Sequence, residues 1–242
     1  MTERILTDDG QDLRYIDENY KYIKNKIEEA ALRSGRSPAE VRFMAVTKTV
    51  APYIINRAIA CGADLIGENK VQELLSKLDD LHTGGLEMHI IGHLQSNKVK
   101  KIITTVAMIQ SVDSVSLAEE ISKRAVENGV VMDVLTEVNI GCEWSKTGFA
   151  CEELTERSLE IDALPGVNVR GYMAIPPVCE TEEEVRGYFS RVRRLFEDAK
   201  PQFGKPSFDT LSMGMSSDYA AAVLEGSTLV RVGSALFGMR RY

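Results

Sequence analysis

One lysine in this sequence ends a run of apolar residues and has the chemistry of a nucleophile. The run Phe43-Met44-Ala45-Val46-Thr47 leads directly into Lys48. An ammonium group is costly to bury unless it is paired or used, and burial favours its neutral amine form. A neutral amine condenses with an aldehyde to give a Schiff base. The alternative is a lysine whose stem lies along apolar surface while its charged end reaches water.

A glycine and two serines follow another apolar run and could bind an anion. In the segment 211–218 the chain passes through Gly214 into Ser216 and Ser217, where we expect a helix to begin. Backbone N–H groups and hydroxyls at such a turn can face a phosphate or a carboxylate. The simpler alternative is that one of the serines only caps the helix.

A second segment near the C-terminus strengthens the prediction of an anion site. Arg231 lies inside the last apolar run, and the pair Gly233-Ser234 follows directly after it. Enzymes with a (β/α)8 barrel often bind phosphate between the loops that follow their seventh and eighth strands. Both segments fall in those loops if the chain folds as such a barrel.

The elements that would position these residues alternate between strands and helices. Short apolar runs typical of buried strands each precede a polar stretch with helical spacing. Eight such units in about 200 residues predict an α/β fold, a (β/α)8 TIM barrel, although an open doubly wound sheet would give similar alternation. The expected strands are 42–48, 64–68, 87–92, 108–112, 132–139, 168–174, 210–214 and 228–232.

An additional helix is expected before the first strand. From Leu13 onward, apolar residues recur at three- and four-residue steps up to the pair Ser34-Gly35. Among the later helices, Glu182–Lys200 has the clearest apolar stripe, with its charges on the other face. No linker or change of composition divides the chain, so we expect a single domain over residues 1–242.

The composition argues against several classes of protein. With 44% hydrophobic and 27% charged residues, the chain has the composition of a globular protein. A net charge of −7 disfavours binding to nucleic acid or to anionic membranes, because both need a basic surface. The charged N-terminus and the lack of a long apolar window disfavour secretion and membrane insertion. The four cysteines form no C-x-x-C pair, which favours free thiols in a reducing cytoplasm.

Other common motifs are absent or weak. The sequence contains no G-x-G-x-x-G, Walker A, G-x-S-x-G or H-E-x-x-H motif. The stretch 145–148, Ser-Lys-Thr-Gly, has the residues of a phosphate loop in the wrong order. His89 and His93 are separated by an apolar strand and Gly92 rather than by one helical turn, so we expect no metal site between them.

A set of short motifs extends in order from Arg42 to Gly238. They are Ala45–Lys48, Gly67–Glu73, His89–Lys98, Val138–Phe149, Gly171–Ala174, Ser212–Asp218 and Val230–Gly238. In these motifs the sequence resembles the pyridoxal 5′-phosphate (PLP) homeostasis proteins of the YggS/PROSC type, whose barrel is similar to the N-terminal domain of alanine racemase. The resemblance implies PLP as the cofactor and PLP binding by the barrel domain.

The resemblance also implies roles for five residues. It makes Lys48 the Schiff-base lysine and assigns the phosphate to Ser216, Gly233 and Ser234. It brings Arg231 close to the pyridine nitrogen of PLP. A guanidinium with a pKa above about 12 donates a hydrogen bond there but no full proton, so the ring stays neutral and withdraws electrons weakly.

Three further residues are implied less directly, and two positions depart from the family pattern. Asn69 and Met213 are expected near the cofactor ring, and Lys146 is expected as a second amine near the barrel mouth. Met88 stands where the family often has tryptophan, and Lys70 where an aromatic residue or arginine is common. Neither departure falls on a position for the aldehyde or the phosphate, so PLP remains the expected cofactor.

Two functions fit this pattern, and a third class fits less well. One is a carrier or buffer that holds PLP and passes it transiently to PLP-dependent apoenzymes, and the other is a PLP enzyme such as an amino-acid racemase. A racemase needs a second base and a lid, which alanine racemases gain from an additional domain and a dimer partner. The chain ends at Tyr242, shortly after its last motif, so we expect no such domain, no efficient catalysis and a monomer. A pure interaction module would have lost the lysine or the phosphate site.

Overall fold

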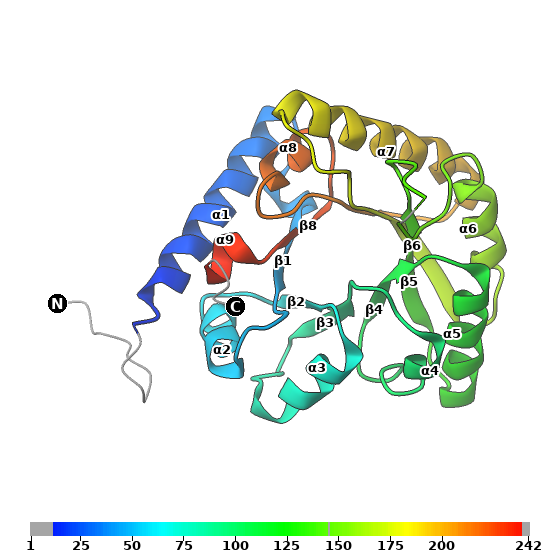
Figure 1. Cartoon of the computed structure of the whole chain (residues 1–242), viewed down its shortest axis with the longest axis horizontal. Coiled ribbons are helices and arrows are strands. Elements are labelled where there is room, and N and C mark those ends of the chain that lie inside the picture. The colour runs from blue at the N-terminus through cyan, green and yellow to red at the C-terminus, as the bar shows by residue number, and fades with distance from the viewer. Residues whose placement is uncertain (1–11, 145, 239–242) are drawn as a thin grey trace.

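Eight parallel strands close into a barrel in the order in which they occur in the chain (Figure 1). The structure is a computed structural model, and it describes residues 12–144 and 146–238. Strand β8 pairs with β1 in parallel, with Phe43 opposite Val230, so the sheet has no open edge. The barrel prediction is therefore confirmed and the open doubly wound sheet is excluded. The strands are β1 Arg42–Val46, β2 Leu65–Glu68, β3 Glu87–Ile90, β4 Met108–Val112, β5 Met132–Val138, β6 Val167–Ala174, β7 Thr210–Ser212 and β8 Leu229–Val232.

The helices lie around the outside of this ring of strands (Figure 1). Each strand in a parallel barrel is therefore covered on its outer face, and all residues of β2, β4 and β8 are buried. No helix in the described part of the chain is long and apolar enough to cross a membrane. The α-helices are α1 Arg14–Arg33, α2 Pro52–Ala60, α3 Val71–Lys77, α4 Ser96–Val99, α5 Val115–Asn128, α6 Leu154–Asp162, α7 Glu182–Phe203, α8 Tyr219–Leu224 and α9 Ser234–Phe237.

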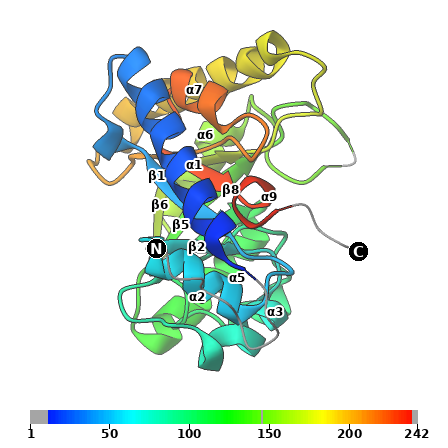
Figure 2. The ribbon, with the colours of Figure 1, turned by 90° about the vertical axis from the view of Figure 1, so that its left-hand side faces the viewer.

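The additional N-terminal helix is confirmed as α1, which packs against α8, α9 and α2 (Figure 2). Its apolar stripe, which includes Ile16, Ile23 and Ile27, is buried in the same cluster as Ala45 of β1 and Val230 of β8. The helix ends where the sequence predicts, because Gly35 takes the left-handed conformation with φ +74°. Helix α1 thus closes the side of the barrel where the first and last strands meet.

Helix α7 is confirmed but is longer than its sequence pattern predicts. It begins after Thr181, whose side chain accepts a hydrogen bond of 3.2 Å from the backbone N–H of Glu184. We predicted an end at Lys200, whereas the helix continues to Phe203 and stops at Gly204, which has φ +59°. A proline in the last turn, Pro201, did not end it, and the left-handed glycine did.

Several strands end before the residues that the sequence pattern assigned to them. β1 ends at Val46 rather than Lys48, β3 at Ile90, β5 at Val138 and β7 at Ser212. The functional consequence is that Lys48 lies two residues beyond β1, in a turn rather than inside a strand.

Candidate functional site

A cavity of about 330 Å³ lies at the C-terminal mouth of the barrel, where the loops after the strands converge. Active sites of this fold lie at the same end, because each strand delivers its following loop there. Six of the seven residues predicted to bind the cofactor line this cavity. These six are Lys48, Asn69, Ser216, Arg231, Gly233 and Ser234.

The backbone around Lys48 forms a tight turn in which Thr49 has φ +62°. This left-handed conformation is costly for a β-branched residue and needs support from its surroundings. The backbone N–H of Val50 closes the turn with a hydrogen bond of 3.0 Å to the carbonyl oxygen of Thr47. Glu73 of α3 accepts a hydrogen bond from the backbone N–H of Thr49. Lys48, between these residues, is partly exposed at the cavity.

A buried lysine connects both sides of this turn. Lys77, at the end of α3, donates from Nζ to the carbonyl oxygen of Thr47 at 2.8 Å and to carboxylate oxygens of Glu68 and Glu73 at 2.7 Å each. Thr47 also donates its hydroxyl to Glu68 at 2.8 Å. Three charged side chains therefore hold the backbone on both sides of Lys48. We call Glu68, Glu73 and Lys77 the lysine-turn cluster.

The two acids of the lysine-turn cluster have opposite pKa shifts. Burial raises the pKa of Glu68, which is fully buried and has no partner for its Oε2 atom among the described residues. The pKa of Glu73 is lowered because its hydrogen bonds to Lys77 and to the backbone of Thr49 outweigh its partial desolvation. The carboxylate that contacts the turn directly is thus the one that stays ionised most readily.

Ser216 joins the two loops that the sequence assigned to an anion. Its Oγ atom accepts hydrogen bonds from the backbone N–H groups of Gly233 at 3.1 Å and of Ala235 at 3.2 Å. The residue that caps α8 by position is Asp218, so Ser216 does not serve as its N-cap. The hydroxyl occupies a place where two backbone donors converge, which is the geometry that an anionic oxygen requires.

Gly233 is needed for a reason that the sequence did not reveal. A Cβ atom at this position would lie 3.3 Å from the Cβ of Val46 and 3.4 Å from its carbonyl oxygen. Val46 is the last residue of β1 and lies two residues before Lys48. The small size of Gly233 therefore lets the loop after β8 approach the end of β1.

Arg231 forms the buried floor of the cavity and is only 4% exposed. Its guanidinium donates from Nη1 to Ser212 Oγ at 2.6 Å and from Nη2 to the carbonyl oxygen of Ala174 at 2.9 Å. Burial lowers the pKa of Arg231 to about 10, although the charges of Glu137 and Asp218 raise it. At neutral pH it is still a cation that donates hydrogen bonds without releasing a proton.

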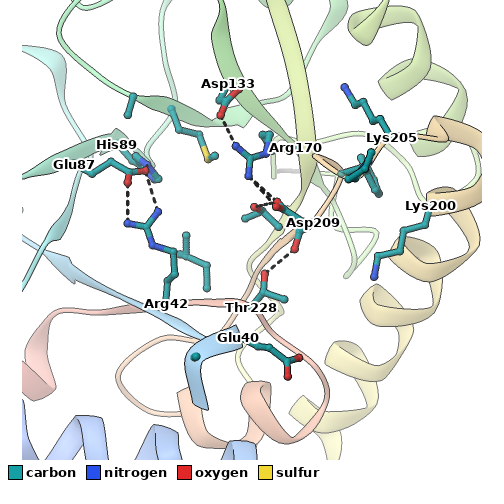
Figure 3. Close-up of a pocket in the computed structure, with 17 residues that line it drawn as sticks. Glu40, Arg42, Glu87, His89, Asp133, Arg170, Lys200, Lys205, Asp209 and Thr228 are labelled. Carbon is teal, nitrogen blue, oxygen red and sulfur yellow. Dashed lines mark hydrogen bonds and ion pairs between the residues drawn. The ribbon is translucent and has the colours of Figure 1, made fainter. Parts of the chain in front are cut away.

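A larger cavity, of about 640 Å³, lies at the opposite, N-terminal mouth (Figure 3). Both of its arginines pair with carboxylates that also line the cavity. Arg42 donates two hydrogen bonds to the carboxylate of Glu87, at 3.0 and 2.8 Å. Arg170 donates to Asp133 at 2.6 Å and to both oxygens of Asp209 at 2.9 Å. This mouth is lined by ion pairs that tie the strand starts together.

The described residues contain no cluster of three or more histidine, cysteine or acidic side chains that could hold a metal ion. His89 bonds to Glu87 and to Gln110 inside the barrel, whereas His93 bonds to Asp113 outside it. The two histidines therefore do not share a ligand site.

Comparison with known proteins gives the family. The family model for the alanine racemase N-terminal domain matches residues 11–241. A pyridoxal phosphate homeostasis protein of Aquifex aeolicus is 42% identical over 225 residues, which cover 93% of this chain and 98% of the relative. The chain belongs to the family of the pyridoxal phosphate homeostasis proteins.

Solved structures of similar proteins agree with this assignment. A protein of unknown function from Bifidobacterium adolescentis has a TM-score of 0.88 at 35% identity, and the match covers 97% of this chain and 98% of that one. PipY of Synechococcus elongatus PCC7942, solved with PLP bound, has a TM-score of 0.78 at 34% identity, with 92% of this chain and 100% of that one covered.

Two residues implied by the resemblance, Met213 and Lys146, do not line the candidate cavity. Met213 is fully buried in the core and does not line the cavity, whereas Met215 does. Lys146 lies outside the cavity, pairs with Glu143 and lines a neighbouring space of about 750 Å³. The strand β7 ends one residue before Met213, so its side chain still points into the core.

The two departures from the family pattern lie away from the cavity lining. Met88 is partly buried in β3 and packs against the core clusters, and Lys70 is exposed just before α3. Sequence reasoning missed Ile91 and Ile175, which line the cavity directly after β3 and β6. The rule that loops after strands build the site could have found both of them.

Proposed function

We propose that this protein binds PLP covalently through Lys48 and acts as an intracellular carrier or buffer of PLP, without efficient catalysis. The observation that carries the proposal is the shared cavity. One amine, one buried guanidinium and the Ser216–Gly233 donor pair line a single space at the C-terminal mouth. The PLP-bound structure of PipY and the names of the relatives support the same cofactor.

The groups that line the cavity match the reactive parts of PLP one by one. The aldehyde requires an amine, the phosphate requires several N–H or O–H donors, and the pyridine nitrogen requires a donor or an acid. Lys48, the Ser216–Gly233 pair and Arg231 supply these in that order. The cavity volume of about 330 Å³ is also at the scale of a small-molecule site.

The formation of a Schiff base between Lys48 and PLP needs no reactant besides the amine and the aldehyde. The neutral amine of Lys48 adds to the aldehyde carbon, its protons move to the carbonyl oxygen, and that oxygen leaves as water. The reverse reaction needs only water, so the same lysine can release the cofactor intact. The partial exposure of Lys48 is consistent with a site that loads and unloads.

Ser216 and Gly233 are proposed to hold the phosphate together with the more exposed Ser234. The N–H groups of Gly233 and Ala235 now donate to the Ser216 hydroxyl, and an oxygen of a phosphate dianion could accept from the same donors. Arg231 is proposed to face the pyridine nitrogen, Asn69 to lie beside the ring, and Met213 to support the ring from the core rather than to touch it.

The lining argues for a carrier rather than a racemase. Among the described residues that line the cavity, Lys48 is the single group able to accept a proton from carbon at neutral pH. A racemase needs one base on each face of its substrate, and a protonated pyridine nitrogen would strengthen the electron sink. Arg231 stays charged at neutral pH and supplies no such proton.

This part of the proposal is tested by isotope exchange. We expect incubation of the PLP-loaded protein with L- or D-alanine in deuterium oxide to give negligible exchange of the α-hydrogen. Exchange at enzyme-like turnover, on the order of 1 per second, that is lost in Lys48→Ala would replace the carrier by a genuine PLP enzyme.

Cytoplasmic location, a monomeric state and delivery to PLP-dependent apoenzymes belong to the same proposal. All four cysteines are free thiols, as expected in a reducing compartment. The exposed mouth gives a recipient protein access to the cofactor.

The proposal as a whole is tested by absorbance and peptide mapping. The purified protein mixed with PLP should gain a yellow absorbance band that borohydride abolishes, and the reduced adduct should map to Lys48. An adduct on Lys146 with Lys48 unmodified would overturn the assignment of the lysine, and no band at all would overturn the proposed function.

A further inference from the structure

A line of buried polar side chains crosses the barrel from one mouth to the other. It begins at Arg231 beneath the candidate cofactor cavity and ends at the ion pair of Glu87 and Arg42 at the N-terminal mouth (Figure 3). Between these ends lie Ser212 of β7, Gln110 of β4 and His89 of β3, each fully buried. The function proposed above leaves these three residues without a role.

The hydrogen bonds along this line all run in one direction. Arg231 donates to Ser212 Oγ at 2.6 Å, and Ser212 donates to Gln110 Oε1 at 2.7 Å. Gln110 Nε2 then donates to His89 Nδ1 at 2.8 Å. His89 Nε2 lies 2.7 Å from Glu87 Oε1. Because Nδ1 accepts, the proton of a neutral imidazole must be on Nε2, where it donates to the carboxylate.

The electrostatics favour the same neutral imidazole. Burial lowers the pKa of His89, against the opposing effects of Glu87 and of the more distant Asp133. Glu87 has its pKa lowered to about 2, first by its hydrogen bond to His89 and also by Arg42. The line therefore ends on a carboxylate that stays ionised, and this fixes the direction of every hydrogen bond between it and Arg231.

Burying so many polar groups is costly unless each of them has a partner, and here each one does. An apolar barrel core would hold the strands together without them. The reason for these buried polar groups lies at the Arg231 end of the line, where Ser212 holds the guanidinium. Gln110 accepts the hydroxyl hydrogen of Ser212, which directs the lone pairs of Ser212 Oγ toward Arg231, and His89 holds Gln110 in that orientation.

We propose that Ser212, Gln110 and His89 form a positioning relay that holds the guanidinium of Arg231 in one orientation toward the pyridine ring of PLP. The proposal rests on the function proposed above and adds three residues to it. The relay acts through Arg231 and touches no cofactor atom itself. Its second anchor, the carbonyl of Ala174, is backbone and cannot adjust.

The relay predicts how its parts respond to substitution. Without the Ser212 hydroxyl, Arg231 loses one of its two acceptors and its guanidinium becomes free to turn. The ring contact weakens, whereas the proposed phosphate contacts stay as they are, because the hydrogen bonds between Ser216 and the backbone of Gly233 and Ala235 do not involve Ser212 or Arg231. Binding of PLP and of pyridoxal, which lacks the phosphate, should therefore weaken by the same factor, about tenfold for one lost hydrogen bond to a charged group.

The first experiment measures the relay in the protein without PLP. Nitrogen NMR of the histidine side chains should show His89 as the neutral tautomer protonated at Nε2, with no titration between about pH 6 and 8. The guanidinium signals of Arg231 should show slow rotation in the unmodified protein and faster rotation in Ser212→Ala. A His89 protonated at Nδ1, or Arg231 signals that are unchanged in Ser212→Ala, would overturn the relay even if PLP binds as proposed.

The second experiment uses the PLP-loaded protein and a matched control. Ser212→Ala and Gln110→Met should both shift the nitrogen NMR signal of ¹⁵N-labelled PLP and weaken PLP and pyridoxal equally. The control Ser158→Ala removes another fully buried serine hydroxyl, bonded at 2.8 Å to Thr136 and remote from the relay, and should leave the ring signal unchanged.

The outcomes separate the relay from the proposed function. An unchanged ring signal in both relay variants, or an equal change in Ser158→Ala, would overturn the relay and leave PLP binding in place. Failure of the unmodified protein to bind PLP would overturn the proposed function, and the tautomer and rotation measurements would still decide whether the relay exists.

Discussion

The two mouths of this barrel differ in the volume of their cavities and in whether their arginines are already paired with carboxylates, and among the described residues the smaller cavity holds the unpaired arginine. The N-terminal cavity is nearly twice as large, about 640 Å³ against about 330 Å³, yet its arginines are occupied by carboxylates. At the C-terminal mouth, the hydrogen bonds of Arg231 go to neutral oxygens, and backbone donors converge on a hydroxyl. The smaller cavity is therefore the one whose donor groups can bind an anionic ligand.

The difference follows from the direction of the strands. In a parallel barrel all strands start at one mouth and end at the other, and the functional site is built from the loops that follow the strand ends. The N-terminal mouth is closed by ion pairs between neighbouring strand starts, which stabilise the barrel. The C-terminal mouth carries a lysine in a strained turn and a glycine-dependent close approach, which are features of function rather than of stability.

The largest effect should come from the lysine of the C-terminal mouth. Lys48→Ala should abolish the yellow band and the borohydride-trapped adduct, because no other amine lines the described part of the cavity. The matched control Lys205→Ala removes a lysine of the N-terminal mouth and should keep the adduct. Circular dichroism checks the fold of both variants. Loss of the adduct in Lys205→Ala as well would contradict the assignment of PLP binding to the C-terminal mouth.

The lysine-turn cluster should be the next most sensitive region. Lys77→Met leaves the buried carboxylate of Glu68 without its cation, which we expect to cost about 3 kcal/mol of unfolding free energy. Urea unfolding measures this loss, and the double variant Lys77→Met/Glu68→Gln should recover much of it because no buried charge remains. If the double variant were as unstable as the single one, packing rather than charge would explain the effect.

At the N-terminal mouth we expect a loss of stability without a loss of binding. Arg170→Ala removes hydrogen bonds to Asp133, Asp209 and the carbonyl oxygen of Ser207, and should cost about 2 kcal/mol of unfolding free energy. Its affinity for PLP should remain within about twofold, as expected for a residue remote from the ligand. The control Arg157→Ala removes exposed ion pairs and should cost much less unfolding free energy than Arg170→Ala. A tenfold loss of PLP affinity in Arg170→Ala would contradict the division of roles.

A smaller effect is expected from the glycine that brings the two loops together. Gly233→Ala places a Cβ 3.3 Å from Val46 and should displace the donors of the phosphate. PLP binding should weaken about tenfold, as for a lost charge-assisted contact, and pyridoxal binding much less. The control Gly187→Ala adds a methyl group where nothing lies within 4 Å. Equal weakening of both ligands would place the phosphate elsewhere.

The smallest effect concerns pH and the ion pair at the N-terminal mouth. The folded protein holds the pKa of Glu87 at about 2, below the ordinary value of 4.5, so the unfolded chain binds this proton first as the pH falls. The stabilisation is complete above pH 4.5 and is lost between pH 4.5 and 2. Urea unfolding at several pH values should show a shallower loss in Glu87→Gln. Identical slopes in the two proteins would show that this carboxylate does not contribute.

The residues that line the candidate site were largely predictable because most of them follow strand ends. Lys48 and Gly233 each stand where an apolar run gives way to a polar or small residue, whereas Arg231 is a charged residue inside such a run, and all three line the cavity. Met213 lies in the core because it follows Ser212 directly, and successive side chains of an extended segment point to opposite faces. Ser212 faces the barrel interior, where it bonds to Gln110, so Met213 faces the core outside the barrel.

The supporting residues could not be predicted in the same way. Gln110 stands out in the sequence as an amide inside an apolar strand, but its neighbours along the chain do not reveal its partners. Ser212 lies 102 positions from it, and the two meet because β4 and β7 both face the barrel interior. The same holds for Lys77, which reaches the backbone of Thr47 over 30 positions.

The alternation of strands and helices, the N-terminal helix and the chemical groups available at the strand ends could all be inferred from the amino-acid sequence. These features depend on local patterns of apolar residues, which act over one or two turns of helix or a few residues of strand. The closure of β8 on β1, the contact between Ser216 and Gly233, and the line of buried hydrogen bonds across the core became visible only in the folded chain. Such contacts depend on the closure and register of the whole barrel, because the hydrogen-bond partners come from strands far apart in the chain.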